Sequence, residues 1–199
     1  MFENITSLQN PKIKNIVKLQ EKSSERRNQG LVVVEGLREI GLALDAGLVI
    51  VTLFYCEEFN VTISSIIPQA KTVFTISKEV FKKIAYREDS DGVLVIFKPQ
   101  FYSLATIKLS TNPFLIVIEG VEKPGNLGAI LRTADAAQVD AVIICDPKTD
   151  IYNPNVIRSS VGCVFTTQVL ACTSDELQEW LKQKGITPYA AALPAHQFY

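Results

Sequence analysis

The sequence is poor in the residues that build metal sites, since its 199 residues include one histidine and four cysteines. Cys56, Cys145, Cys163 and Cys172 are scattered, and their spacing is not that of metal ligands. Three of them lie in or beside apolar runs, which favours reduced, buried thiols in a cytoplasm. The single histidine, His196, stands near the chain end. The sequence therefore predicts no metal site and a cytoplasmic protein.

Long apolar runs and the common phosphate-binding fingerprints are also missing. No run approaches the roughly 20 residues that a membrane-spanning helix needs, so a membrane protein is not expected. Gly120, Gly125 and Gly128 do not follow the GxGxxG spacing, and no GK[ST] sequence follows them. A P-loop is therefore excluded, and a nucleotide-dependent oxidoreductase is disfavoured. Taken by themselves, these glycines are interpreted as turn residues with positive φ.

The net charge is small, but the charged residues are unevenly distributed along the chain. The net charge is −1, yet residues 1–38 carry seven lysines and arginines against four glutamates, a local net charge of +3. A basic segment on an acidic body is compatible with contacts to nucleic-acid phosphates. Lysines are also common on any solvated helix, so the charge pattern leaves both interpretations open.

The first half of the chain alternates between short apolar runs and helical patterns, which predicts an α/β fold. Helix starts are expected where a capping residue precedes an apolar face, at Asn10–Pro11, Glu35–Gly36 and Ser77. Strands are expected at residues 31–34, 49–55, 73–76 and 93–97. We predict one domain over residues 1–97, a linker over 98–112 and a second domain over 113–199.

The second half opens with a strand, glycine turn, helix and strand between Phe114 and Asp146. Such units almost always form parallel neighbours, and ligands of parallel sheets bind at the carboxyl ends of the strands. Residues 119–128 are therefore expected at a site. Further along, we expect helices capped by Asn153 and Ser174, and strands over residues 163–170 and 189–193.

Each of three side chains near this loop has a structural and a functional interpretation, and both stay open. Asn126 could cap the following helix or present its amide to a ligand. Arg132 could form a surface pair with Asp135, three residues on, or offer its guanidinium to a phosphate. Arg158 poses the same choice on the next expected helix.

Two segments then resemble known signatures. Residues 126–137, NLGAILRTADAA, and residues 153–162, NPNVIRSSVG, resemble the first and second signatures of the SpoU-type (TrmH-like) RNA 2′-O-methyltransferases of the SPOUT superfamily. Arg26-Arg27, GLVVVEGLR at 30–38 and ALDAG at 43–47 resemble the ribosomal-protein-like RNA-binding domain that precedes them. The resemblance runs from about residue 5 to residue 199.

The resemblance implies a fold, a reaction and partners. The fold would be a small α/β RNA-binding domain followed by a parallel-sheet methyltransferase domain of the trefoil-knot type. The reaction would transfer a methyl group from S-adenosylmethionine to a ribose 2′-hydroxyl of structured rRNA or tRNA, with rRNA favoured. The complete protein would form a homodimer, with no metal and no membrane.

The resemblance also implies roles for individual residues. Arg132 would be the catalytic arginine that activates the 2′-hydroxyl, and Asn126 would hold the geometry beside it. RNA contacts would come from a set of basic and hydroxyl side chains, namely Arg26, Arg27, Arg38, Arg158 and Ser160.

The family's third signature, an Asn-Val-Ser segment that closes the knot, is absent from the sequence. Only Ala192 and Leu193 would remain of the cofactor cleft. We therefore expect a chain that is truncated at its C-terminus. An alternative from another class is a non-catalytic RNA-binding protein that uses the N-terminal domain.

Overall fold

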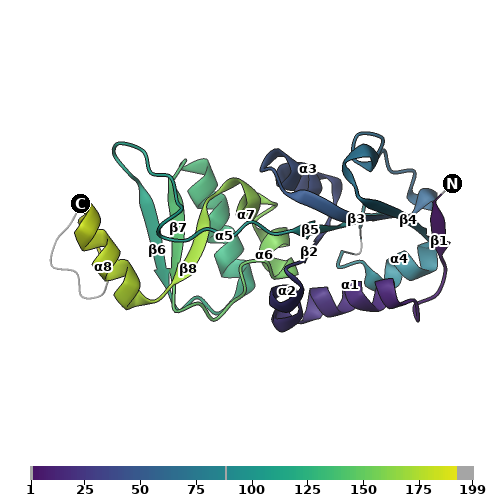
Figure 1. Cartoon of the computed structure of the whole chain (residues 1–199), viewed down its shortest axis with the longest axis horizontal. Helices are drawn as coiled ribbons and strands as arrows, with labels where there is room; N and C mark the ends of the chain where they lie inside the picture. Colours follow the sequence, from purple (N-terminus) through teal and green to yellow (C-terminus); the bar gives the residue numbers. More distant parts are fainter. Residues whose placement is uncertain (1, 88, 192–199) are drawn as a thin grey trace.

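The computed structural model describes residues 2–87 and 89–191 and contains two β-sheets that lie side by side along the long axis (Figure 1). We call residues 2–98 the first half and residues 115–191 the second half. The mixed α/β class with a parallel second sheet agrees with the prediction from sequence.

The first half is built on a five-stranded mixed sheet in the order β1-β4-β3-β5-β2. β3 pairs in parallel with β4 and antiparallel with β5. Its strands are β1 (Glu3–Ile5), β2 (Val32–Glu35), β3 (Val49–Tyr55), β4 (Thr72–Ile76) and β5 (Val93–Lys98). Its helices are α1 (Pro11–Glu21), α2 (Ser23–Gln29), α3 (Leu37–Asp45) and α4 (Lys78–Ile84), with short 3₁₀ turns η1 (Glu57–Phe59) and η2 (Ile67–Gln69).

Local signals in the sequence explain where two of these helices start. The Asn10 side chain accepts a hydrogen bond from the Lys12 amide at 2.9 Å, with Pro11 at the first helical position. Ser77 accepts from the amide of Val80 at 3.4 Å. Both starts were predicted, as were four strands to within one residue at each end, whereas β1 and α2 were missed.

Helices cover both faces of the first sheet. α1 and α4 pack on one face, around Phe54, Phe74 and Leu94. α3 packs on the other face, and this core continues without interruption into Leu127 and Leu131 of the second half. Figure 1 shows α3 above the sheet and α1 and α4 below it. The two halves therefore share one apolar core.

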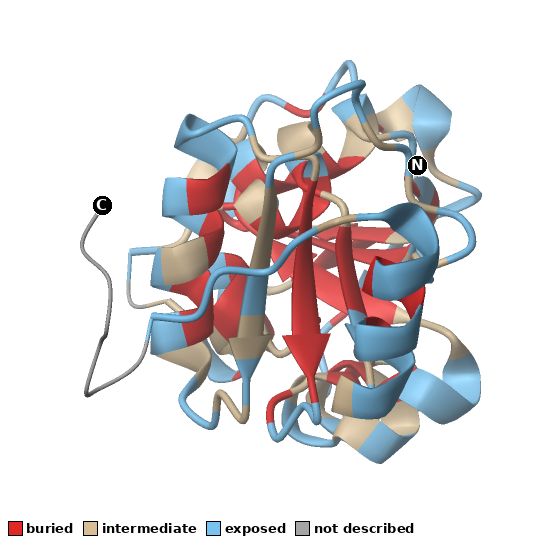
Figure 2. Ribbon diagram, turned by 90° about the vertical axis from the view of Figure 1, so that its left-hand side faces the viewer, coloured by how far each residue is buried: buried red, intermediate tan, exposed pale blue. Residues whose placement is uncertain are grey.

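The second sheet is parallel throughout, in the order β6-β7-β8. β7 is buried along its whole length, while β6 is partly exposed (Figure 2). α8 covers one face through Leu177, Trp180 and Leu181, and the other helices lie toward the first half. The elements are β6 (Leu115–Glu119), α5 (Pro124–Ala136), β7 (Ala141–Cys145), α6 (Pro154–Ser159), α7 (Cys163–Thr166), β8 (Val169–Cys172) and α8 (Ser174–Lys184).

The strand predicted over residues 163–170 is wrong in its first part, because Cys163–Thr166 forms the short helix α7 and β8 begins at Val169. Val161 and Gly162 both adopt positive φ and turn the chain just before α7. Tertiary packing then overrides the strand preference of this apolar run, since Val164 and Phe165 are buried in the shared core.

Two further boundaries differ from the prediction. The cap of α8 is Thr173 in place of Ser174, in a capping box with Glu176. Residues 189–191 carry no strand, and the remainder of the strand predicted to end at Leu193 lies outside the described residues. No helix in the described ranges has the length and apolar content needed to cross a membrane.

The segment that joins the two sheets, residues 99–114, has neither helix nor strand, and side chains of the second half hold it in place. The Asp140 carboxylate accepts hydrogen bonds from the amides of Ser110 at 2.6 Å and Phe114 at 2.7 Å. The Gln168 side chain accepts from the amide of Lys108 and donates to its carbonyl, at 2.9 and 2.8 Å. The segment is thus fastened to the amino-terminal edge of the second sheet.

Candidate active site

Helix α5 carries the two residues predicted to be catalytic. Asn126 lies inside its first turn, so it is not the cap, which is Lys123 without a side-chain hydrogen bond. Both Asn126 and Arg132 are exposed. Arg132 forms no ion pair with Asp135 within the described part of the chain; Asp135 instead accepts a hydrogen bond from Thr166 Oγ1 at 2.5 Å. The surface-pair interpretation of Arg132 is therefore not supported, and its guanidinium faces solvent.

The charges of arginines from both halves act on Cys163 at the start of α7. Burial raises the pKa of the Cys163 thiol and Asp135 adds to this rise, while the positive charges of Arg38 and Arg132 act in the opposite direction. α3, which carries Arg38, and α5, which carries Arg132, both pack against α7. The fold therefore brings together two helices that are far apart in the sequence.

Gly162 makes this approach of the two halves possible. A Cβ atom at this position would lie 2.7 Å from Leu42 Cδ1 and 3.4 Å from the Cα of Glu39, both in α3. Gly162 also has a φ of 86°, a conformation that favours glycine. We call the boundary between the two halves the seam. Its contact between α3 and α7 depends on a residue without a side chain.

Gly128 brings the two signatures together in the same way. A Cβ atom there would lie 2.7 Å from Ser159 Cβ and 2.7 Å from the backbone nitrogen of Ser160. α5 and α6 therefore pack in direct backbone contact. The interpretation of Gly128 as a turn residue is wrong, because it lies inside α5 without positive φ, as does Gly125; Gly120 does adopt a φ of 63°.

Of the two RNA contacts predicted in the second signature, only one is accessible. Arg158 is exposed, and its Cζ lies 6.0 Å from the centroid of the Tyr86 ring. Ser160 is fully buried, donates to the carbonyl of Ile157 at 3.1 Å and accepts from the amide of Val164 at 3.4 Å. Its burial contradicts a direct RNA contact, because the hydroxyl joins α6 to α7.

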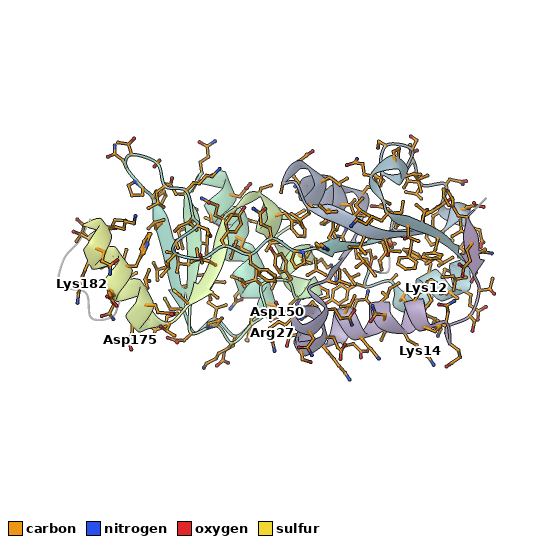
Figure 3. The ribbon with its side chains drawn as sticks, in the orientation of Figure 1. Lys12, Lys14, Arg27, Asp150, Asp175 and Lys182 are labelled. Carbon is orange, nitrogen blue, oxygen red and sulfur yellow. The ribbon has the colours of Figure 1, made fainter. Side chains whose placement is uncertain are left out.

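Of the two RNA contacts predicted on α2, one is buried and the other is exposed. Arg26 is only 4% exposed, and its Nε donates to Asp150 Oδ2 at 2.6 Å. Its Nη1 donates to the carbonyls of Leu19 and Gln20, at 2.6 and 3.0 Å. This contradicts the prediction for Arg26, whose guanidinium ties the two halves together. Arg27 is exposed and lies near the same seam (Figure 3).

The carboxyl ends of the parallel strands form an acidic edge, in the region where the sequence predicts a site. Ser174 Oγ lies 2.7 Å from Asp146 Oδ2 and 3.5 Å from Glu119 Oε1. Beside this edge, Thr149 Oγ1 donates to the carbonyl of Glu122 and so joins the loops after β6 and β7. In the described part of the chain, no group of three histidine, cysteine or acidic side chains could hold a metal ion.

Comparison with known proteins identifies the family. The SpoU rRNA Methylase family matches residues 113–199, and the MRM3-like substrate binding domain matches residues 10–95. A solved structure of an RNA 2′-O ribose methyltransferase is 34% identical, with a TM-score of 0.77, and the match covers 96% of this chain and 75% of that one. The chain belongs to the SpoU rRNA methylase family.

Other relatives agree with this assignment. The 23S rRNA (guanosine(2553)-2′-O)-methyltransferase RlmP of Bacillus subtilis is 28% identical over 192 residues, which cover 96% of this chain and 74% of that protein. The AdoMet-bound rRNA methyltransferase from Sinorhizobium meliloti is also 28% identical, with a TM-score of 0.81, and the match covers 91% of this chain and 69% of that one. The family expected from the two signatures is confirmed.

Two predicted site residues stay predictions, and two residues at the seam and the loops were not predicted. Ala192 and Leu193, predicted to bind the cofactor, lie outside the described residues. Sequence reasoning missed Asp150, which binds Arg26 across the two halves, and Thr149, which joins the loops after β6 and β7. Nothing local in the sequence marks them, because each acts on a residue far away along the chain.

Proposed function

We propose that this SpoU family member transfers a methyl group from S-adenosylmethionine to a ribose 2′-hydroxyl of rRNA. The observation that carries the proposal is the direct packing of the two signature helices, α5 and α6, at Gly128, in a chain whose family and solved relatives are RNA methyltransferases. We favour rRNA over tRNA because the family and the relatives described above are named for rRNA.

Arg132 is the proposed catalytic residue. The 2′-hydroxyl is a poor nucleophile, so the site must stabilise the negative charge that develops on its oxygen and align it with the methyl group. A fixed guanidinium near that oxygen supplies the charge, and exclusion of water strengthens its effect. The guanidinium of Arg132 is exposed and takes part in none of the ion pairs of the described residues, so it is open to the substrate, which would cover it on binding. Asn126, six residues earlier on the same helix, would hold the geometry of the site beside it.

The cofactor would occupy the region beside the carboxyl ends of the parallel strands, with Ala192 and Leu193 in its cleft. S-adenosylmethionine supplies an electrophilic methyl group on a sulfonium. The carboxylates of Glu119 and Asp146 lie at this edge, and their negative charge suits a ligand that carries a sulfonium and an amino group. Ser174, within reach of both carboxylates, fixes their orientation.

The accessible arginines suggest a route for the RNA. Arg27, Arg38 and Arg158 are exposed and lie on α2, α3 and α6, all of which border the seam. Guanidinium groups bind phosphates through paired hydrogen bonds. We propose that RNA crosses the seam, so that residues 1–97 bind the substrate, residues 98–112 connect, and residues 113–199 carry out the transfer.

The assembly and location of the protein are proposals that rest on the family. We propose a cytoplasmic homodimer formed through the second half. Sedimentation of the purified protein across a concentration series tests the dimer, and a single monomer species throughout would contradict it.

A methyl-transfer assay tests the function. Labelled S-adenosylmethionine and deproteinised rRNA are incubated with the chain, with an Arg132→Ala variant and with a Thr133→Ala control on the next exposed position of α5. We expect the Arg132→Ala variant to lose transfer by about a hundredfold or more while the control keeps it. Equal transfer by Arg132→Ala would refute the catalytic role. RNA binding without any transfer by the unsubstituted chain would instead support the non-catalytic RNA-binding protein.

A further inference from the structure

Tyr86 is an exposed aromatic residue of the first half that lies at the seam. It follows α4 by two residues. The Cζ atom of Arg158, on α6 of the second half, lies 6.0 Å from the centroid of its ring. Pro154 and Ile157 of α6 line a small cavity together with Tyr86. The ring thus stands where the first half meets the second signature, and the proposed catalytic site assigns it no role.

The backbone at Tyr86 is fixed by a buried carboxylate. Glu35, at the end of β2, accepts hydrogen bonds from the amides of Tyr86 at 2.6 Å and of Arg87 at 3.3 Å. Arg87 in turn pairs with Glu39 of α3, which is also buried. A buried carboxylate is costly unless it is hydrogen-bonded, so these contacts hold Tyr86 and Arg87 in one backbone conformation. A ring on a fixed backbone loses little further freedom when a ligand binds to it.

A ligand of Tyr86 must use the exposed surface of the ring. The cavity that Tyr86 shares with α6 measures only about 20 Å³. A space of this size holds about one water molecule, and it is too small for a nucleobase. The ring is therefore available from the solvent side, where a flat ligand can lie on it.

The charges around Tyr86 favour an anionic ligand on the side of α6. The guanidinium of Arg158 is exposed and takes part in none of the ion pairs of the described residues. Glu35 is occupied by two backbone amides, and Asp91 accepts the first backbone amide of α3 at 3.0 Å. Asp89 is exposed. An RNA strand would therefore reach Tyr86 from the side of Arg158.

We propose that Tyr86 stacks on the base of an unpaired nucleotide of the substrate RNA while Arg158 binds a phosphate of the same strand, an inference that rests on the proposed function. Proteins bind unpaired bases on aromatic side chains, and guanidinium groups bind phosphates. Bases inside a duplex are already stacked on their neighbours, so Tyr86 selects single-stranded RNA at the seam. A protein partner suits this surface less well, because stable protein interfaces have an apolar centre, whereas Tyr86 has two arginines beside it, Arg87 and Arg158.

Helix α6 relates the stacked nucleotide to the site of methyl transfer. Arg158 meets Tyr86, and the next residue, Ser159, meets α5 at Gly128. α6 therefore contacts both Tyr86 and the helix that carries Arg132. The stacked nucleotide is thus a neighbour of the methylated nucleotide, and it contributes to binding and not to the chemical step.

Fluorescence anisotropy with two labelled RNAs tests the stacking without relying on catalysis. A short oligoadenylate offers unpaired bases, whereas a blunt RNA duplex of the same length offers phosphates and bases that are already paired. We expect Tyr86→Ala to bind the oligoadenylate about tenfold more weakly and the duplex as before. Tyr86→Phe keeps the ring and should bind both RNAs like the unsubstituted chain.

Phe2→Ala is the matched control. Phe2 is 40% exposed against 44% for Tyr86, and it precedes β1, which lies at the opposite edge of the sheet from β2 and far from α6 (Figure 1). This variant should bind both RNAs unchanged. Equal losses of Tyr86→Ala with the two RNAs, or no loss with the oligoadenylate, would overturn the proposal. Failure of the unsubstituted chain to bind the oligoadenylate would overturn it as well.

Photo-crosslinking locates the base directly. An oligoadenylate that contains one 5-iodouridine should crosslink to Tyr86, as identified by mass spectrometry, and crosslinks only at other residues would contradict the stacking. Arg158→Gln should lower the salt dependence of oligoadenylate binding by about one unit, because it removes one phosphate contact.

Steady-state kinetics separate this role from catalysis. Tyr86→Ala should raise the KM for rRNA about tenfold and leave kcat unchanged, because a contact that is equal in the ground state and the transition state affects binding alone. A lower kcat with an unchanged KM would refute the assignment. If Tyr86→Ala binds oligoadenylate normally and the unsubstituted chain methylates rRNA, the stacking proposal fails and the proposed function stands. If Tyr86→Ala loses oligoadenylate binding but the unsubstituted chain does not methylate, the stacking stands and the proposed function fails.

Discussion

Substitution of Asp150 by asparagine tests the ion pair that joins the two halves of the protein. Asparagine has the same shape and can still accept the 3.0 Å hydrogen bond from the Tyr152 amide through Oδ1. It removes the negative charge that lies 2.6 Å from Arg26 Nε. Arg26 is 4% exposed, so its positive charge would remain buried without a counter-charge.

The expected loss of stability follows from this burial. Removing one partner of a buried ion pair costs about 3–5 kcal/mol, because the other charge stays desolvated. Arg26 keeps the carbonyl oxygens of Leu19 and Gln20, and Asp150 itself is 18% exposed. Both features place the loss at the lower end, at about 3 kcal/mol. A second ion pair, Lys148–Glu122, provides the control, since its side chains are 60% and 66% exposed.

Urea unfolding followed by circular dichroism measures the effect. Asp150→Asn should lower the free energy of unfolding by about 3 kcal/mol, and Glu122→Gln by less than about 1 kcal/mol. The loss in Asp150→Asn should persist at high salt, because buried pairs are screened much less than exposed ones. Equal losses in the two variants, or a loss that salt removes, would refute the view that Arg26 and Asp150 act as a buried connection between the halves.

Two further predictions concern packing and pH. Gly128→Ala should lower the free energy of unfolding by about 1–3 kcal/mol by pushing α5 from α6, while Gly125→Ala, which meets no atom within 4 Å, should cost far less; similar midpoints in urea would contradict the close packing. The hydrogen bond from the amide of Phe114 lowers the pKa of Asp140, and hydrogen bonds from Ser110 lower it further. A carboxyl group whose pKa is lowered in the folded protein stabilises the fold above the usual carboxyl pKa of about 4. The unsubstituted protein should therefore be more stable than Asp140→Asn at neutral pH. This advantage should vanish as the pH falls below about 4. An advantage that is unchanged in acid would contradict this assignment.

The sequence by itself predicted features that depend on neighbouring residues. Asn10 and Ser77 cap helices through hydrogen bonds that reach two or three residues along the chain. Asn153 does the same for α6, accepting from the amide of Asn155 at 2.8 Å. The two signatures and the parallel pairing of β6 with β7 were also recognisable, because residue spacing records them.

Other features were decided by the tertiary structure alone. Arg26 and Arg27 are adjacent in the sequence, yet one is buried against Asp150 and the other is exposed. No local pattern separates them, because the partner of Arg26 lies 124 residues away. The same holds for two glycines. Gly128 lets α6 approach α5, and Gly162 lets α3 approach the start of α7, because neither glycine has a side chain. Cap hydrogen bonds form within one turn of the chain, whereas burial and close packing depend on which distant segments meet, and that is settled only when the shared core forms.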